Sequence, residues 1–321
     1  METFRPEVRK LLDGFTSRNT QNTYGNGVSS FVNFRLKHGL GDSWPPTVSD
    51  LVNYVAYMSC QGYAPATVKV YLSGLSYWLK VMGINDLTES FILQKMLKGM
   101  DNLYSLADTR KPITLELLIR IMNALTFVCS SVYETMLFRS AFSLAFFALL
   151  RVGEITIHTN TRHVINKTDV NFSSNLQSLY VTIPFSKTDQ KGVSTTLIIS
   201  KFDQESVCPV RLLLKYISVR HEENGPLFCH CSKTGITRYQ FSKVLKKSLS
   251  FIGCNPDDYN THSFRIGAAT YFSLLGQTDE EIMSKGRWKS TSFKRYTHSI
   301  IIITLLSFQF GIMIYGLLVL H

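Results

Sequence analysis

Near the carboxyl end of the chain lie three short segments whose side chains could act together on a phosphodiester. They are Thr-His-Ser-Phe-Arg at 261–265, Gly-Arg-Trp at 286–288 and Lys-Arg-Tyr-Thr-His at 294–298. Guanidinium, imidazole and indole N–H groups can hold phosphate oxygens while a phenol oxygen attacks the phosphorus. His262 and Arg265 are three residues apart, so they would share one face of a helix that Thr261 could cap. Gly267 would let that helix pack closely against a neighbour, and together these features predict an active site.

The composition restricts the class of protein. A chain of 321 residues can bury two hydrophobic cores, so two domains are expected. The hydrophobic content of 45% and charged content of 18% exclude a disordered protein. A net charge of +11 and a pI near 9.3 favour a polyanionic partner, either nucleic acid or an anionic membrane surface. Six cysteines and the absence of a signal-like apolar stretch at the start indicate a reducing compartment.

The Cys229-His230-Cys231 segment has metal-ligating residue types but the wrong spacing. Its three candidate ligands are too crowded for a zinc knuckle, and no second pair completes the set. We therefore expect small buried residues on a strand and no metal.

The first hundred residues have the pattern of short amphipathic helices separated by Pro- and Gly-containing turns. The expected helices are 21–37, 49–60, which Thr47 to Asp50 would cap, and 66–81. The polar stretch 99–112 has the composition of a linker. The sequence predicts a four-helix amino-terminal domain that ends near residue 105.

The remainder is predicted to be mixed. Residues 133–150 are apolar on nearly all sides and should form a buried helix. Residues 179–185 and 193–200 should form a β-hairpin with Lys187 near its tip. The other expected helices are 113–125, 209–220, 237–252, 262–275 and 279–285.

Four motifs, taken in order, resemble those of the tyrosine recombinases (the phage-integrase family). They are Leu-Leu-Arg-Val-Gly-Glu-Ile at 149–155, Ser-Lys-Thr-Asp-Gln at 186–190, Thr-His-Ser-Phe-Arg-Ile-Gly-Ala-Ala-Thr at 261–270, and Gly-Arg-Trp-Lys-Ser followed by Phe-Lys-Arg-Tyr within 286–296. The resemblance extends from about Thr20 to His298. In general the chain resembles the Xer recombinases. More narrowly, it resembles the recombinases of eukaryotic DIRS-type and Crypton-type mobile elements. One departure is that Trp288 precedes Tyr296 by eight residues, one fewer than expected of bacterial relatives.

The resemblance implies a mainly α (α+β) fold with two domains that close around duplex DNA as a C-shaped clamp. A helical, SAM-like core-binding domain would occupy residues 1–105 and a linker residues 106–112. A mostly helical catalytic domain with a small antiparallel sheet would occupy residues 113–299. Residues 300–321 would be an apolar tail.

The resemblance also implies a role for each matching residue. Those carried over are Arg151, Lys187, His262, Arg265, Trp288 and Tyr296, with Glu154 as structural support. The two arginines would clamp the scissile phosphate, and the histidine and the indole N–H would donate further hydrogen bonds. Tyr296 would be the nucleophile that forms a 3′-phosphotyrosyl link, and Lys187 would be the general acid for the leaving 5′-oxygen. The family needs neither a metal nor another cofactor.

Each residue also has a purely structural interpretation. Arg151 could cap the carboxyl end of the preceding helix, and Lys187 could be a solvated charge in a turn. His262 and Trp288 could be core residues, and Tyr296 could be a surface tyrosine.

The expected partner is double-stranded DNA. Its phosphates could be contacted by Lys69, Lys80, Lys243, Lys246 and Lys247, although these lysines could equally be solvated. The resemblance implies a homo-tetramer on two DNA sites, with a dimer on each, and a nuclear location.

The apolar run 300–320 conflicts with this interpretation. It contains no charged residue and is long enough to span a bilayer. It could be unrelated sequence at the end of a degraded element, a membrane anchor, or a helix that docks on a neighbouring subunit. Besides an active recombinase, the sequence therefore leaves open an idle DNA-binding relic and a tail-anchored membrane protein.

Overall fold

The computed structural model describes residues 5–41, 44–104, 110–157, 164–184, 194–221 and 223–294. The chain divides between Asp108 and Thr109 into two compact units. Each unit has a hydrophobic core of its own. The two cores agree with the expectation from chain length, and the exact domain boundaries stay a prediction.

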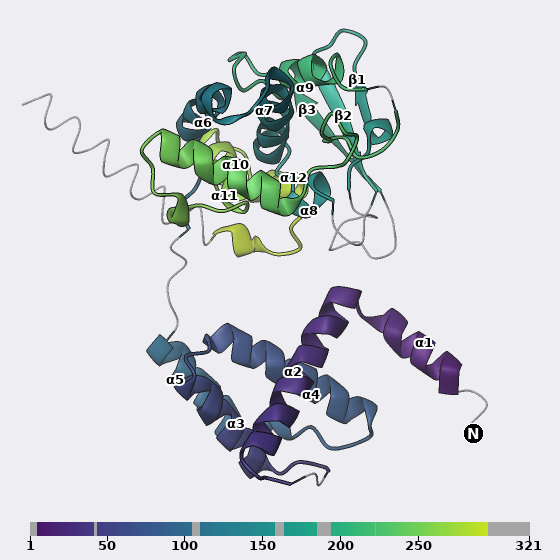
Figure 1. Ribbon diagram of the computed structural model, residues 1–321, viewed down its shortest axis with the longest axis vertical. Coiled ribbons are helices and arrows are strands. Elements are labelled where there is room, and N and C mark those ends of the chain that lie inside the picture. Colours follow the sequence, from purple (N-terminus) through teal and green to yellow (C-terminus); the bar gives the residue numbers. More distant parts are fainter. Residues whose placement is uncertain are drawn as a thin grey trace, which may run out of the picture. The chain divides into compact units, whose positions relative to one another are not determined.

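The amino-terminal unit is helical throughout its described part (Figure 1). Its α-helices are α1 (Arg5–Phe15), α2 (Arg18–Lys37), α3 (Val48–Cys60), α4 (Pro65–Val81) and α5 (Phe91–Tyr104). The expected cap of α3 is present as a reciprocal capping box between Thr47 and Asp50. The prediction of four helices was wrong by one, because α1 is an additional short helix ahead of Ser17, which caps α2.

Two glycines set the distance between α2 and α4. A Cβ on Gly27 would lie 2.7 Å from the carbonyl oxygen of Tyr71, and a Cβ on Gly74 would lie 2.7 Å from that of Tyr24. The two helix backbones therefore touch at a crossing where no side chain fits. Beside the crossing, buried residues such as Phe31 fill the core of this unit.

The carboxy-terminal unit combines helices with one small sheet (Figure 1). Its α-helices are α6 (Leu115–Val128), α7 (Val132–Phe147), α8 (Val152–Ile155), α9 (Pro209–Ile217), α10 (Arg238–Phe251), α11 (Ser263–Leu274) and α12 (Asp279–Gly286). The strands are β1 (Val170–Phe172), β2 (Ser178–Ile183) and β3 (Thr195–Ser200), in the antiparallel order β1-β2-β3. The predicted hairpin is present as β2 and β3, and β1 extends it. The mainly helical fold with a small antiparallel sheet is confirmed.

Helix α7 is the buried centre of this unit, as its apolar sequence predicted. Phe138, Phe142 and Phe146 are fully buried, and the ring of Phe142 packs edge-on against that of Phe241 in α10. Two buried hydroxyl groups on the helix, those of Ser140 and Ser143, donate to backbone carbonyls at 2.7 and 2.6 Å, so these two groups are satisfied. The helix is shorter than predicted because it ends at Phe147, and Leu149 then adopts a left-handed backbone conformation.

No helix in the described ranges is long and apolar enough to cross a membrane. The apolar run 300–320, on which the membrane prediction was based, lies outside those ranges.

Candidate active site

The end of α7 delivers a backbone carbonyl to the centre of the site. Leu149 has φ 45°, which is uncommon for a residue with a side chain. In this conformation its carbonyl oxygen accepts hydrogen bonds from the guanidinium groups of Arg265 and Arg287. Two residues later Arg151 begins α8 as its N-cap residue. The sharp change of direction after α7 therefore places one acceptor and one cation side by side.

Glu154 in α8 is the only carboxylate among the described residues that contacts Arg151 or Arg287. Glu154 is only 3% exposed. It accepts hydrogen bonds from the backbone N–H of Arg151 at 2.8 Å and from its Nη1 at 3.2 Å. It also accepts a hydrogen bond from Nη2 of Arg287 at 2.7 Å. One buried carboxylate thus orients two guanidinium groups.

Helix α11 supplies Arg265 from its first turn. Close packing of this turn depends on Gly267, because a Cβ there would lie 1.8 Å from the carbonyl oxygen of Ile113. This contact bears out the expectation that the glycine permits a close approach. Arg265 is 3% exposed and donates from Nη2 to the carbonyl oxygen of Gly286 at 2.8 Å.

The predicted cap of this helix was wrong. The N-cap residue of α11 is His262, not Thr261, and its side chain makes no capping hydrogen bond. The chain turns into the helix through the Asn260 side chain, which accepts a hydrogen bond from the backbone N–H of His262 at 2.8 Å. The His262 side chain is half-buried, and its phosphate-binding role stays a prediction.

The end of α12 brings a third arginine, Arg287, into the same place. Arg287 is the C-cap residue, with φ 53° and ψ 44° in the left-handed region that glycine usually occupies. A residue with a side chain costs roughly 1–2 kcal/mol in this conformation. Its carbonyl oxygen accepts a hydrogen bond from Nη2 of Arg151 at 3.3 Å, and its own guanidinium is buried.

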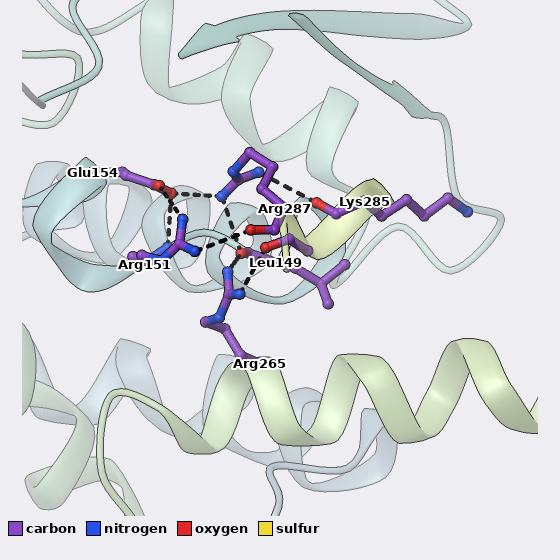
Figure 2. A network of polar contacts seen from close by, with 7 residues as sticks. Leu149, Arg151, Glu154, Arg265, Lys285 and Arg287 are labelled. Carbon is purple, nitrogen blue, oxygen red and sulfur yellow. Dashed lines mark hydrogen bonds and ion pairs between the residues drawn. The ribbon is translucent and has the colours of Figure 1, made fainter. Parts of the chain in front are cut away.

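The three arginines converge around the carbonyl oxygen of Leu149 and the Glu154 carboxylate, as Figure 2 shows. Three guanidinium groups face one carboxylate, so two positive charges are left unbalanced among these side chains. Burial and the neighbouring charges of Arg151 and Arg287 lower the pKa of Arg265 to about 9, so this guanidinium is still protonated at neutral pH. Burial likewise lowers the pKa of Arg287, against the opposing effect of Glu154. An anion with several acceptor oxygens is the ligand that this cluster suits.

The comparisons with known proteins identify the fold. No family model matches the sequence, and no curated protein matches it. A crystal structure of the XerH site-specific recombinase bound to palindromic difH substrate, a post-cleavage complex, matches with a TM-score of 0.63 and 16% identity over 86% of this chain and 75% of that chain. A lambda integrase dimer bound to a COC′ core site matches with a TM-score of 0.61 and 15% identity over 92% and 95% of the two chains. The Tn1549 transposon integrase in complex with circular intermediate DNA matches with a TM-score of 0.61 and 12% identity over 92% and 93%.

The chain has the tyrosine-recombinase fold. Of the residues predicted for the site, Arg151, Glu154 and Arg265 lie in the cluster described above. Lys187 and Tyr296 lie outside the described ranges.

Trp288, the remaining predicted donor, packs closely against Arg265. The guanidinium carbon of Arg265 lies 4.4 Å from the centroid of the indole, a typical cation–π distance. The indole also stacks on Phe293, with ring centroids 5.4 Å apart. A Cβ on Gly286 would lie 2.0 Å from the indole ring, so the ring folds back over that glycine. The Trp288 ring thus lies beside the arginine cluster and packs against one of its members. Hydrogen-bond donation from its N–H stays a prediction.

Lys69 and Lys80, two of the lysines predicted to contact DNA, form ion pairs in the amino-terminal unit. Lys69 pairs with Asp101, and Lys80 pairs with Asp86 at 2.8 Å and with Glu89 at 3.1 Å. Both lysines are about half exposed, and their contact with DNA phosphates stays a prediction.

The other three predicted lysines line one groove of about 920 Å³ along α6 and α10. Lys246 pairs with Asp257 at 2.8 Å, and the Nζ of Lys243 lies 5.5 Å from the ring of Tyr239. Lys247 lines the same groove, so all three lie on one face of α10, as the sequence predicted.

Among the described residues, no group of three or more suitable metal ligands occurs, at the Cys229-His230-Cys231 segment or elsewhere. Cys229 is buried, with its Sγ 3.2 Å from Nε2 of His221. The expectation of buried residues on a strand was wrong for Cys231, which is exposed. The segment makes only an isolated bridge, between Cys229 and Gly235.

Sequence reasoning missed Arg287. It was assigned no role because an arginine that follows a glycine at the end of a helix is common and indicates no particular function. A signal was nevertheless present, because Arg287 precedes Tyr296 by nine residues. Nine residues is the spacing expected in bacterial tyrosine recombinases between the nucleophile and the residue whose role was here given to Trp288.

Proposed function

We propose that this chain is a tyrosine recombinase that breaks and rejoins DNA strands through a 3′-phosphotyrosyl intermediate. The observation that carries the proposal is the cluster of Arg151, Arg265 and Arg287 around a single buried carboxylate, in which Arg265 and Arg287 are themselves buried. It lies within a fold shared with recombinases and integrases whose solved structures contain DNA. A scissile phosphate would supply the negative charge that the cluster lacks.

The arginine cluster suits the electrostatics of strand transfer. When phosphorus becomes five-coordinate, negative charge accumulates on its nonbridging oxygens. Guanidinium groups that are already fixed by Glu154 and by backbone carbonyls can stabilise this charge without having to reorganise. Arginine remains protonated throughout and donates two parallel hydrogen bonds.

Tyr296 would attack the phosphorus, and its phenolic proton would pass to solvent water as the new P–O bond forms. The bond from phosphorus to the 5′-oxygen would break, and Lys187 would protonate that oxygen. His262 would donate to a nonbridging oxygen. Rejoining would be the reverse reaction with a new 5′-hydroxyl as nucleophile. Each step exchanges one phosphoester for another, so no energy source is consumed.

The DNA would be held largely through its phosphates. The net charge of +11 and the lysines on α10 fit a duplex partner, and such binding should weaken steeply with salt. We further propose a tetramer on two DNA sites, membership of the DIRS-type or Crypton-type group, integration of a mobile element and a nuclear location. These four points rest on the motif resemblance.

The test is a covalent trapping experiment on a pool of nicked duplexes whose sequence is randomised on both sides of the nick. The short strand released by cleavage diffuses away, so the protein–DNA adduct accumulates. It is isolated under denaturing conditions in EDTA and sequenced, which also identifies the preferred site. The full-length chain and Tyr296→Phe are compared, because this variant removes one oxygen and little else.

An EDTA-resistant adduct that Tyr296→Phe abolishes supports the proposal. Salt-sensitive DNA binding by a folded protein, with no adduct from any sequence in the pool, would instead indicate an idle DNA-binding relic. A protein that binds no DNA at all would contradict the recombinase function.

A further inference from the structure

Arg287 occupies a backbone position that a glycine would fill with less strain. It ends α12 in the left-handed conformation, with φ 53°. Nothing in the backbone hydrogen bonding of this turn requires a side chain: the N–H of Arg287 bonds to the carbonyl oxygens of Met283 and Ser284, as any residue could. What arginine adds over glycine at this position is therefore its side chain, which carries the guanidinium group.

That guanidinium is buried with part of its hydrogen-bonding capacity unused. Nη2 donates to Glu154 at 2.7 Å and to the carbonyl oxygen of Leu149 at 3.3 Å. Nη1 donates to the carbonyl oxygen of Lys285 at 3.3 Å. Nε is buried and has no hydrogen-bond partner in the described part of the chain. A buried, unsatisfied donor on a cation is costly unless a ligand supplies the missing acceptor or charge.

Neutralising Glu154 does not explain the presence of Arg287. Arg151 already donates twice to that carboxylate, from its backbone N–H and from Nη1. With Arg265 also buried beside them, Arg287 increases an existing excess of positive charge. Such an excess destabilises the protein alone, and it is useful when a negative charge is bound.

Trp288, the next residue, is placed differently. Its indole packs against the guanidinium of Arg265 and against Phe293. These contacts use the faces of the ring and fix the position of Arg265. They do not depend on the indole N–H.

We propose that Arg287 is the third cation of the phosphate site and supplies charge to the scissile phosphate together with Arg151 and Arg265. Trp288 is a positioning residue that holds Arg265 in place through its ring. This inference rests on the function proposed above, and it assigns the cationic role to Arg287, which the motif comparison had left without one.

The test uses the DNA site found by covalent trapping, made with either a normal phosphate or a neutral methylphosphonate at the scissile position. The rate of adduct formation is measured for the full-length chain and for Arg287→Gln, Arg287→Lys and Trp288→Phe. Methylphosphonate lacks the charge that the cations neutralise, so a residue that acts by charge matters less on this substrate.

We expect Arg287→Gln to slow adduct formation by about 100-fold or more on the phosphate but by less than about threefold on the methylphosphonate, each relative to the unmodified chain. Arg287→Lys retains the charge and should lose less than about tenfold on either substrate. Trp288→Phe keeps an aromatic ring but removes the N–H, and it should lose less than about threefold on both.

Equal losses of Arg287→Gln on the two substrates would overturn the inference, since they would indicate a structural role. If Arg287→Gln does not fold, judged by thermal melting, the Lys variant decides: a loss of more than about 100-fold on both substrates rejects the charge role. A loss for Trp288→Phe as large as that for Arg287→Gln would restore the indole N–H as the donor. Failure of the proposed function is distinct, because the unmodified chain would then form no Tyr296-dependent adduct on the phosphate.

Discussion

Replacing Glu154 with glutamine tests whether the arginine cluster is held together by one charge. The side chain is buried and accepts three hydrogen bonds, one from the backbone N–H of Arg151 and two from the guanidinium groups of Arg151 and Arg287. Glutamine has nearly the same shape and one remaining acceptor oxygen. Glu154→Gln would therefore leave three guanidinium groups with no carboxylate among them.

The size of the effect follows from these contacts. Removing one partner of a buried ion pair typically costs 3–5 kcal/mol, and the remaining amide oxygen recovers part of one hydrogen bond. We expect Glu154→Gln to lower the free energy of unfolding by about 3 kcal/mol, which for a unit of this size is a fall in Tm of roughly 6–12 °C.

The assay is thermal and urea unfolding in chloride and in phosphate at equal ionic strength. Because the variant has unopposed cations, phosphate should raise its Tm more than that of the unmodified chain, and phosphate at a hundred times its Kd would restore about 2.7 kcal/mol. A variant that melts within about 1 °C of the unmodified chain would show that the charge of Glu154 does not stabilise the cluster. Equal effects of phosphate and chloride would show that the cluster does not bind this anion.

Three further substitutions test the packing and the charges around the site. Gly267→Ala places a methyl group 1.8 Å from the carbonyl oxygen of Ile113, so we expect a loss of about 3 kcal/mol in urea unfolding, and an unchanged midpoint would contradict this close approach. Gly74→Ala should cost about 1–3 kcal/mol by separating α2 from α4, and a more stable variant would refute the helix contact. For Asp86, burial tends to raise the pKa, but hydrogen bonds from Lys80 and two neighbouring hydroxyl groups outweigh it and hold the pKa well below its usual range. The stability from this carboxylate is therefore present above pH 4 and is lost as the pH falls. Asp86→Asn should lower the free energy of unfolding by about 2 kcal/mol at pH 7 and by progressively less in acid. A stability difference between variant and unmodified chain that does not change with pH would contradict the assignment.

Most of the architecture could be predicted because its signals are local. The capping box at Thr47 and the helical spacing of apolar residues located α3 and its neighbours. The all-round apolar sequence of α7 identified a central helix, and β-branched residues around a polar turn identified the β2–β3 hairpin. Each of these signals lies within one element or within two neighbouring strands, so no knowledge of distant residues was needed.

The missed features depend on partners that are distant in sequence. Strand β1 is only three residues long and forms by pairing with β2. The ion pair between Lys69 and Asp101 joins α4 to α5, and no local pattern around this lysine indicates that it has a partner. The cap of α11 was misplaced by one residue because threonine is the better N-cap by propensity, whereas the turn through Asn260 places His262 there.

The Gly-Arg-Trp motif illustrates why residue types alone did not point to Arg287. By residue type alone, the motif contains one aromatic hydrogen-bond donor, the tryptophan, and one arginine with no evident role. In the structure Gly286 leaves room for the indole to fold back, the left-handed turn at Arg287 directs its guanidinium into the cluster, and the folded indole packs on Arg265. The three residues form one geometric unit, in which the glycine and the tryptophan support two arginines. A substitution at Gly286 should consequently disturb Arg265, because any Cβ there would displace the indole against which that guanidinium packs.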